Sequence, residues 1–244
     1  MKQYQLSTGE KKFIGLHLLV AMLALAVGSL FGPLQAFEHA GWDVYPYIKP
    51  LIKSYYQGLT VHGVLNALVW TTFFIMGFLT FNVMFGLKRP LKNMILNKVG
   101  FWLMVVGVVA AAIPILANQA TVLFTFYPPL KANWAFYLGL TLVVVGSWVE
   151  GWGLFMTYAA WRKENPNERT PFIAFASILT ALLWQICTLG VATEILTMLL
   201  PWSLGLLENV DPQLARTYFW FTGHPLVYFW LLPAYISWYA MLPK

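Results

Sequence analysis

Cysteine and charge are both scarce in this sequence. Only one of the 244 residues is a cysteine, Cys187, so an intrachain disulfide is excluded and a cysteine-based metal site is not indicated. Charged residues make up 10% of the chain and hydrophobic residues 59%, whereas an average soluble domain has about 25% charged residues. This composition is typical of integral membrane proteins. The net charge of +6 does not indicate a nucleic-acid partner, because the basic residues lie in short segments between apolar runs.

Six apolar runs are long enough to cross a lipid bilayer. No small-residue cleavage site follows the first run, so a signal peptide is not expected. The runs must be helical, because lipid cannot satisfy unpaired backbone groups. The sequence therefore predicts an all-α integral membrane fold, with one transmembrane domain over residues 1–244 and neither a soluble domain nor an internal repeat. The runs are Phe13–Phe37, Leu59–Phe85, Met94–Ala117, Asn133–Ala160, Pro171–Leu200 and Gln213–Leu242.

The distribution of basic residues predicts the topology. If the six runs alternate in direction, eleven Lys and Arg residues fall on one side of the membrane and four on the other. The richer side is expected to be cytoplasmic, which places both termini in the cytoplasm. The outer loops GWDVYPYIKP and LFTFYPPLKANW carry the aromatic residues of an interfacial belt. The eleven are Lys2, Lys11, Lys12, Lys88, Arg89, Lys92, Lys98, Arg162, Lys163, Arg169 and Lys244, and the four are Lys49, Lys53, Lys131 and Arg216.

Histidine is also rare, and one of the four histidines stands early in the second run. This residue is His62, in the segment QGLTVHGVLNALVW. A histidine inside a membrane needs a polar partner or a metal, and neutral imidazole is a good ligand of haem iron. A hydrogen bond to a neighbouring helix explains His62 equally well. His17 is interpreted as a helix-contact histidine and His39 as a solvated loop residue.

A stripe of tyrosines follows His224 in the sixth run. His224 lies about ten residues, or ~15 Å, from the outer end of the predicted helix, near the middle of the membrane. At 100° per residue, Tyr228, Tyr235 and Tyr239 fall within about 60° of it around the helix axis. Such a stripe can pack helices through hydrogen bonds or relay protons to a buried site. A buried histidine at its head favours a redox or metal site.

Two acidic residues lie inside apolar runs. Glu194 is near the outer end of the fifth run and Glu150 is in the inner half of the fourth. Each must be protonated, paired or exposed to a wet cavity. Glu150 is either a proton-handling group or a protonated acid bonded to a neighbouring helix. In the sixth run, Pro225 and Pro233 remove backbone donors and predict kinks.

The segment TGHPLVYFWLLPAY, residues 222–235, resembles the sixth-helix signature of subunit I of the haem–copper oxygen reductases. The resemblance implies that His224 is a ligand of the copper called Cu-B. It also implies that Tyr228 is covalently joined to His224 and supplies an electron and a proton when the O–O bond breaks. The spacing of four residues suits this pairing, because it places the phenol one helical turn from the imidazole.

A second segment, SYYQGLTVHGVLNAL, is similar to the helix that ligates the low-spin haem in this family. His62 would then be one of the two axial ligands of a b-type haem. The segments VGSLFGPLQA, LANQATVLFTFYPPLKANWAFYLG and LLPWSLGLLENVDPQLART resemble the B-type, or ba-type, branch. In that branch one proton path rises through tyrosines of the sixth helix, which maps onto Tyr235 and Tyr239.

The resemblance also implies that this chain is the N-terminal part of a longer subunit. Subunit I of the family has twelve or more helices and carries its other two Cu-B ligands, the high-spin haem ligand and the second low-spin haem ligand further along. We therefore expect the first half of that bundle, inactive without the C-terminal half. The intact enzyme would be a proton-pumping terminal oxidase in a prokaryotic plasma membrane. It would reduce dioxygen to water with electrons from cytochrome c, delivered through a copper-bearing subunit II.

Other functions remain as alternatives. A quinol oxidase of the same superfamily differs mainly in subunit II, so the present residues do not exclude it. A transporter or channel could use the tyrosine stripe as a polar path. A nitric oxide reductase is disfavoured, because those enzymes lack the tyrosine that stands here at position 228.

Overall fold

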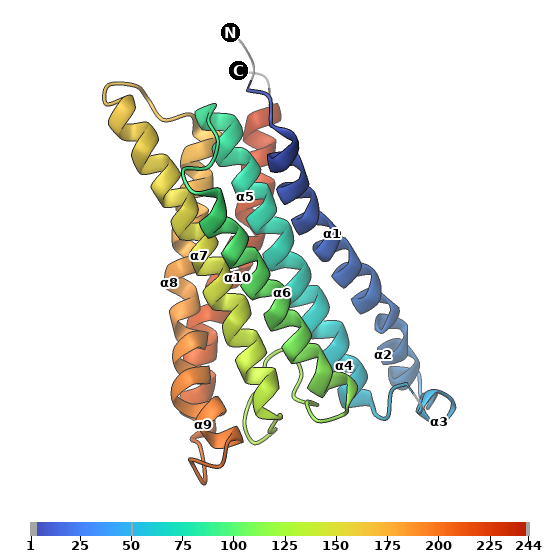
Figure 1. The fold of residues 1–244 in the computed structure, drawn as a ribbon. Helices are drawn as coiled ribbons and strands as arrows, with labels where there is room; N and C mark the ends of the chain where they lie inside the picture. Colours follow the sequence, from blue (N-terminus) through green and yellow to red (C-terminus); the bar gives the residue numbers. More distant parts are fainter. Residues whose placement is uncertain (1–3, 50, 243–244) are drawn as a thin grey trace.

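The computed structural model describes residues 4–49 and 51–242, and every regular element in these ranges is a helix. The long helices lie side by side in one bundle (Figure 1). The start of α1 and the end of α10 lie at the same end of the bundle, as an even number of crossings requires. Lys2 and Lys244, used above for the topology, lie outside the described residues, and the orientation in the membrane stays a prediction. The elements are α1 (Thr8–Leu30), α2 (Gly32–His39), α3 (Tyr45–Ile48), α4 (Tyr55–Gly63), η1 (Val64–Trp70), α5 (Thr71–Leu87), α6 (Met94–Leu116), α7 (Trp134–Glu164), α8 (Phe172–Glu194), η2 (Ile195–Leu199), α9 (Leu200–Ser203) and α10 (Pro212–Met241).

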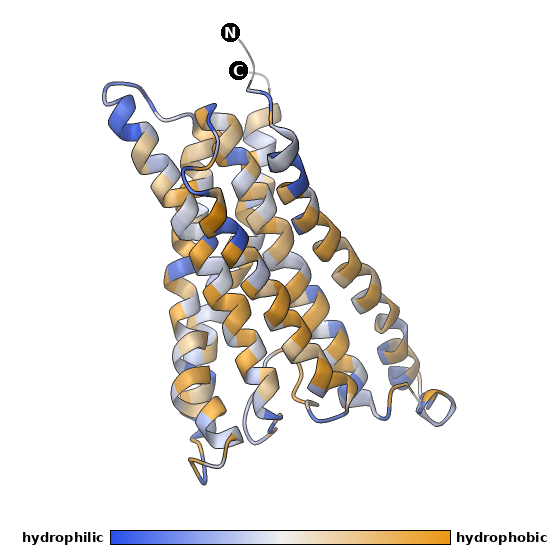
Figure 2. Ribbon diagram, in the orientation of Figure 1, coloured by the Kyte–Doolittle hydropathy of each residue, from blue (hydrophilic) through white to orange (hydrophobic). Residues whose placement is uncertain are grey.

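Five helical segments in the described part of the chain are long and apolar enough to span a membrane. They correspond to the first five predicted runs, and Figure 2 shows hydrophobic residues along the middle of these helices. The sixth predicted span, α10, has 30 residues but is not among the five. Its sequence is interrupted by a histidine, prolines, tyrosines and tryptophans, which are less apolar than the aliphatic residues of a typical span. The membrane-protein fold class is confirmed, with α10 as a long but less apolar member of the bundle.

Two of the predicted continuous α-helices contain π-helical segments. The second run continues from α4 through the π-helix η1 into α5, and the fifth continues from α8 through the π-helix η2 into α9. A π-helical turn carries one extra residue, which rotates the following side chains around the axis, and such turns are frequent at functional sites. The first run differs as well, because a turn at Phe31 separates α1 from α2. In α10 the helix continues through Pro225 and Pro233, so neither proline ends it.

Glycines bring α6 and α7 into backbone contact. A methyl group on Gly107 would lie 2.5 Å from the carbonyl oxygen of Gly139, and one on Gly100 would lie 2.6 Å from that of Gly146. Backbones approach this closely only where neither residue has a side chain, which is the usual way that membrane helices associate. The helices α6 and α7 therefore form a tight hairpin, against which α4, α5 and α8 pack.

Gly107→Ala is expected to lower the free energy of unfolding by about 1–3 kcal/mol, because the added methyl group has no room between the two backbones. Thermal unfolding in detergent, followed by circular dichroism, measures the change. Gly15→Ala is the matched control, since a methyl group on Gly15 meets no other atom within 4 Å. Equal losses of stability in the two variants would contradict close packing as the cause.

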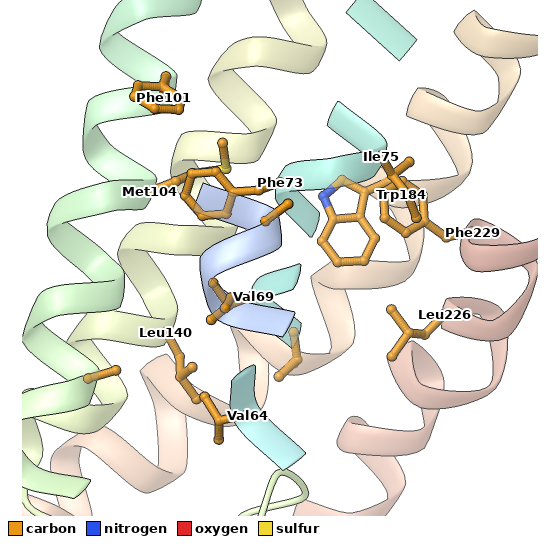
Figure 3. Close-up of a cluster of buried hydrophobic side chains, with 14 of the residues drawn as sticks. Val64, Val69, Phe73, Ile75, Phe101, Met104, Leu140, Trp184, Leu226 and Phe229 are labelled. Carbon is orange, nitrogen blue, oxygen red and sulfur yellow. The ribbon is translucent and has the colours of Figure 1, made fainter. Parts of the chain in front are cut away.

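The helices α8 and α10 pack against each other through aromatic contacts and one hydroxyl group. The rings of Trp184 and Phe229 are stacked with their centroids 4.2 Å apart (Figure 3). Thr222 donates a 2.7 Å hydrogen bond to the carbonyl of Cys187 and accepts one of 2.8 Å from the amide of Val191. In a regular α-helix these two groups bond to each other. The threonine two residues before His224 thus bridges the backbone of α8 and fixes the position of α10.

Candidate functional site

His62 stands at the end of α4, where it faces α1. Its Nδ1 lies 2.9 Å from the carbonyl oxygen of Gly28 and 3.3 Å from Nδ2 of Asn66. The ring also lies against Gly32, because a methyl group there would be 3.3 Å from Cε1 of His62. A carbonyl oxygen only accepts hydrogen bonds, so Nδ1 carries the hydrogen and Nε2 keeps its lone pair. The structure thus holds an imidazole in the tautomer that can bind a metal through Nε2.

A large cavity lies between the second predicted span and α10. Its volume is about 580 Å³, and its walls come from η1, α5 and the second half of α10. The indole Nε1 atoms of Trp70 and Trp230, which line this cavity, are buried without a hydrogen-bond partner among the described residues. Buried polar groups are normally satisfied, so these atoms indicate that a further group occupies the space. The lining residues are Asn66, Ala67, Trp70, Thr71, Phe74, Ile75, Phe78, Trp230, Pro233, Ala234 and Ser237.

In α10, His224 and Tyr228 lie next to each other, as their spacing predicts. The hydroxyl of Tyr228 is 3.4 Å from Nε2 of His224, and the two ring centroids are 5.6 Å apart. This contact engages Nε2, so Nδ1 is the nitrogen that remains for a metal. Within residues 4–49 and 51–242 there is no group of three or more His, Cys, Asp or Glu side chains that could hold a metal ion. A metal at His224 would therefore need further ligands from outside the described residues.

The face of α10 that carries the tyrosine stripe is exposed. His224 is exposed, Tyr228 and Tyr235 are 50% and 40% exposed, and Tyr239 is 68% exposed. The expectation of a buried histidine is wrong for this chain, because α10 packs on α8 through its other face. That other face includes Phe219, Thr222, Leu226, Phe229 and Ile236.

His17 and Glu150 form a pair between α1 and α7 in which both side chains are fully buried. Nε2 of His17 is 3.0 Å from each carboxyl oxygen of Glu150, and Nδ1 is 3.0 Å from the carbonyl of Phe13. Because Nδ1 must donate to this carbonyl, the other nitrogen and the carboxyl group share one further proton. The prediction of a helix-contact role for His17 is confirmed. Glu150 is bonded to a neighbouring helix, which agrees with the second of its two interpretations.

The other two titratable residues named from the sequence lie apart from these groups. Glu194 ends α8, is completely buried, and has two carboxyl oxygens without a hydrogen-bond partner in the described part of the chain. His39 is exposed, as expected, but it ends the helix α2 instead of lying in a loop. Neither residue contributes to the cavity beside α10.

Asn66, Trp70 and Trp230 are the site residues that the sequence did not single out. Asn66 follows His62 by one helical turn, a spacing that could have drawn attention to it. The two tryptophans carried no such signal, because 12 tryptophans are spread through the chain. Their role at the cavity depends on the contact between η1, α5 and α10, which brings residues more than 150 positions apart together.

Comparisons with known proteins identify the family of this chain. Residues 12–244 match the family model described as cytochrome c and quinol oxidase polypeptide I. The chain is 48% identical over 239 residues to cytochrome c oxidase subunit 1 of Thermus thermophilus. This alignment covers 96% of the present chain and 42% of that relative. It is 23% identical over 262 residues to a probable quinol oxidase subunit 1 of Staphylococcus epidermidis. That alignment covers 99% of the present chain and 38% of the relative.

A solved structure of a heme-copper terminal oxidase dimer contains a chain with the same fold. The TM-score is 0.86 at 42% sequence identity, over 96% of this chain and 40% of that one. The present chain thus spans about two fifths of the length of the relatives it matches. The family resemblance that the segment TGHPLVYFW indicated is confirmed, and the chain belongs to the cytochrome c and quinol oxidase polypeptide I family, the subunit I proteins of the haem–copper oxidases.

Proposed function

We propose that this chain forms the N-terminal part of the catalytic subunit of a B-type terminal oxidase, which reduces dioxygen to water in a prokaryotic plasma membrane. The observation that carries the proposal is the contact between Tyr228 and Nε2 of His224, which leaves Nδ1 for copper. The chain would form part of a single transmembrane domain with the C-terminal half of the subunit. That half would cover the exposed face of α10 and bring the remaining metal ligands.

His62 would bind the low-spin haem, a b-type haem in this proposal, through Nε2. The fit rests on two features of the chain. The bond from Nδ1 to Gly28 fixes the required tautomer, and partners that orient a ligating histidine in this way are usual at metal sites. In addition, Asn66 lies one turn after His62 and lines an apolar cavity whose buried polar atoms lack partners. A cavity of several hundred Å³ with a few polar groups is typical of cofactor sites.

His224 would be the one Cu-B ligand in this chain, and Tyr228 its covalently joined partner. The haems and copper, when bound, supply electron transfer and the reduction of dioxygen. Tyr228 would hold a proton and an electron beside that centre. Tyr235 and Tyr239 lie below it on the same face of α10, so a proton could pass along them from the cytoplasmic side. The high-spin haem ligand would come from the C-terminal half.

Electrons would come from cytochrome c through a copper-bearing subunit II. The relative with 48% identity bears the name of a cytochrome c oxidase, whereas the quinol oxidase relatives are 23–24% identical. Quinol remains the second candidate donor, because the family model covers both kinds of oxidase. Oxygen uptake by the purified complex with reduced cytochrome c or with a quinol separates the two. Family membership favours either oxidase over a transporter or channel.

The proposal is tested by His62→Ala in the complete oxidase complex. The variant is expected to lose the absorption band of the low-spin haem, because alanine offers no ligand, while the band of the high-spin haem remains. His39→Ala is the matched control, since His39 is exposed at the end of α2. An unchanged low-spin band in His62→Ala would overturn the assignment of His62. A wild-type complex without any haem absorption would overturn the proposed function itself.

A further inference from the structure

We propose that Asn66 is a positioning residue for His62. Its side-chain oxygen and the carbonyl of Gly28 both accept the hydrogen bond from Nδ1 of His62, and this lowers the reduction potential of the haem bound at Nε2. This inference rests on the proposed function, because it concerns a haem ligand. It goes further because it assigns a role to Asn66, for which the sequence indicated none.

The donors and acceptors around Nδ1 of His62 support this role. Nδ1 must carry a hydrogen, because its 2.9 Å partner is the carbonyl oxygen of Gly28. The amide nitrogen of Asn66, 3.3 Å from Nδ1, then faces another donor, and Oδ1 of Asn66 has no partner within residues 4–49 and 51–242. Neither end of the amide is satisfied in this orientation. Turning the amide by 180° exchanges two atoms of almost equal size, and it gives the oxygen the Nδ1 hydrogen as a donor.

The backbone around Asn66 is built for this contact. Asn66 lies in the π-helix η1, which packs against α1. A methyl group on Gly28 would overlap Oδ1 of Asn66 and lie 2.9 Å from Cβ of Leu65. The side chain of Asn66 therefore occupies the space that a glycine leaves free, directly beside the carbonyl that accepts from His62. Two elements from different parts of the sequence thus meet on one nitrogen of one imidazole.

The chemical consequence follows from the charge on the ring. Each acceptor at Nδ1 draws its hydrogen away and makes Nε2 more electron-rich, which raises the basicity of the ligand. A more basic axial ligand favours ferric over ferrous iron, and hydrogen bonding around the ligands is one of the ways in which proteins set haem potentials. Removing one acceptor should therefore raise the potential of this haem.

Asn66→Leu in the complete oxidase complex tests the inference, because leucine has a similar size but no acceptor. At a fixed ambient potential, the ratio of reduced to oxidised low-spin haem is expected to rise about tenfold, which for one electron is a shift of 59 mV. A spectroelectrochemical titration of the low-spin band measures it. The electron paramagnetic resonance of the ferric haem should change as well, because the imidazole plane loses one of its two restraints.

Two further variants complete the design. Asn66→Asp retains an oxygen at the same place, so its potential should equal or lie below that of the wild type. Ser203→Ala is the control, because Ser203 lies in α9, away from this cavity, and its hydroxyl donates to the carbonyl of Leu200; this variant should behave as the wild type. If the leucine variant loses the haem, retention in the aspartate variant still supports the role of the acceptor.

Three results would overturn the inference while leaving the proposed function intact. They are an unchanged potential and resonance in Asn66→Leu, a raised potential in Asn66→Asp, and loss of the haem from both variants. A wild-type complex without a low-spin haem would instead contradict the assignment of His62, so the two failures are distinguishable.

Discussion

Glu150→Leu is expected to lower the free energy of unfolding by about 3–5 kcal/mol, the usual cost of removing one partner from a buried pair. The reason is the complete burial of the pair and the contacts of its histidine. His17 is packed among the rings of Phe13, Phe73 and Phe101, so Nε2 would find no replacement for the carboxyl group. Unfolding in mixed detergent micelles, followed by circular dichroism, measures the loss.

The double variant His17→Leu/Glu150→Leu separates the pair from its individual members. Replacing a buried pair by apolar side chains of similar volume is often neutral or stabilising. The double variant should therefore regain most of the stability that Glu150→Leu loses. A double variant whose loss equals the sum of the two single losses would show that the residues act independently, which would contradict the pairing. Asn97 donates a hydrogen bond to the backbone carbonyl of Glu150, so this second contact is retained in every variant.

The third predicted helix agrees best with the structure, because clear signals bound its apolar run. Met94–Ala117 was predicted and Met94–Leu116 is observed, since Asn93 caps the first turn of α6 with its side chain. Hydrophobic length alone could not reveal the π-helices η1 and η2. An extra residue in a turn leaves the composition unchanged, and its position depends on contacts with neighbouring helices.

The sequence shows which buried polar residues need a partner, but not which residue each partner is. The sequence identified His17 and Glu150 as groups that need partners, but it did not join them. Their contact depends on the register of α1 against α7 across 133 positions of sequence. The cavity beside α10 was missed for the same reason. By contrast, the contact between His224 and Tyr228 is local to one helical turn, so the spacing of four residues predicted it.

Burial of His224 was predicted wrongly, and the reason concerns helix packing. Depth along a helix follows from counting residues, whereas the direction of a face depends on which helices surround it. The stripe was correctly placed on one face, but this face is exposed in the present chain. In the proposed oxidase the longer subunit supplies the helices that cover it.

The second large effect is expected for Tyr228→Phe in the complete oxidase complex. If Tyr228 supplies a proton and an electron beside the metal centre, its loss should reduce oxygen turnover by about 10²–10⁴-fold, the range of a positioned proton donor. The low-spin haem spectrum should stay unchanged, because His62 belongs to α4 and not to α10. Steady-state oxygen uptake and absorption spectra of the same preparation measure the two quantities together.

Tyr218→Phe provides the matched control for this variant. Tyr218 lies on the same helix, but six residues before His224, which places it about 120° away from His224 around the axis. Its replacement should leave turnover at the wild-type level. Wild-type turnover in Tyr228→Phe would remove the proposed role of the tyrosine, and the contact with His224 would then be explained by packing. A large loss in Tyr228→Phe alone, with both haems retained, would support the role, because the phenylalanine ring fills the same space and lacks only the hydroxyl group.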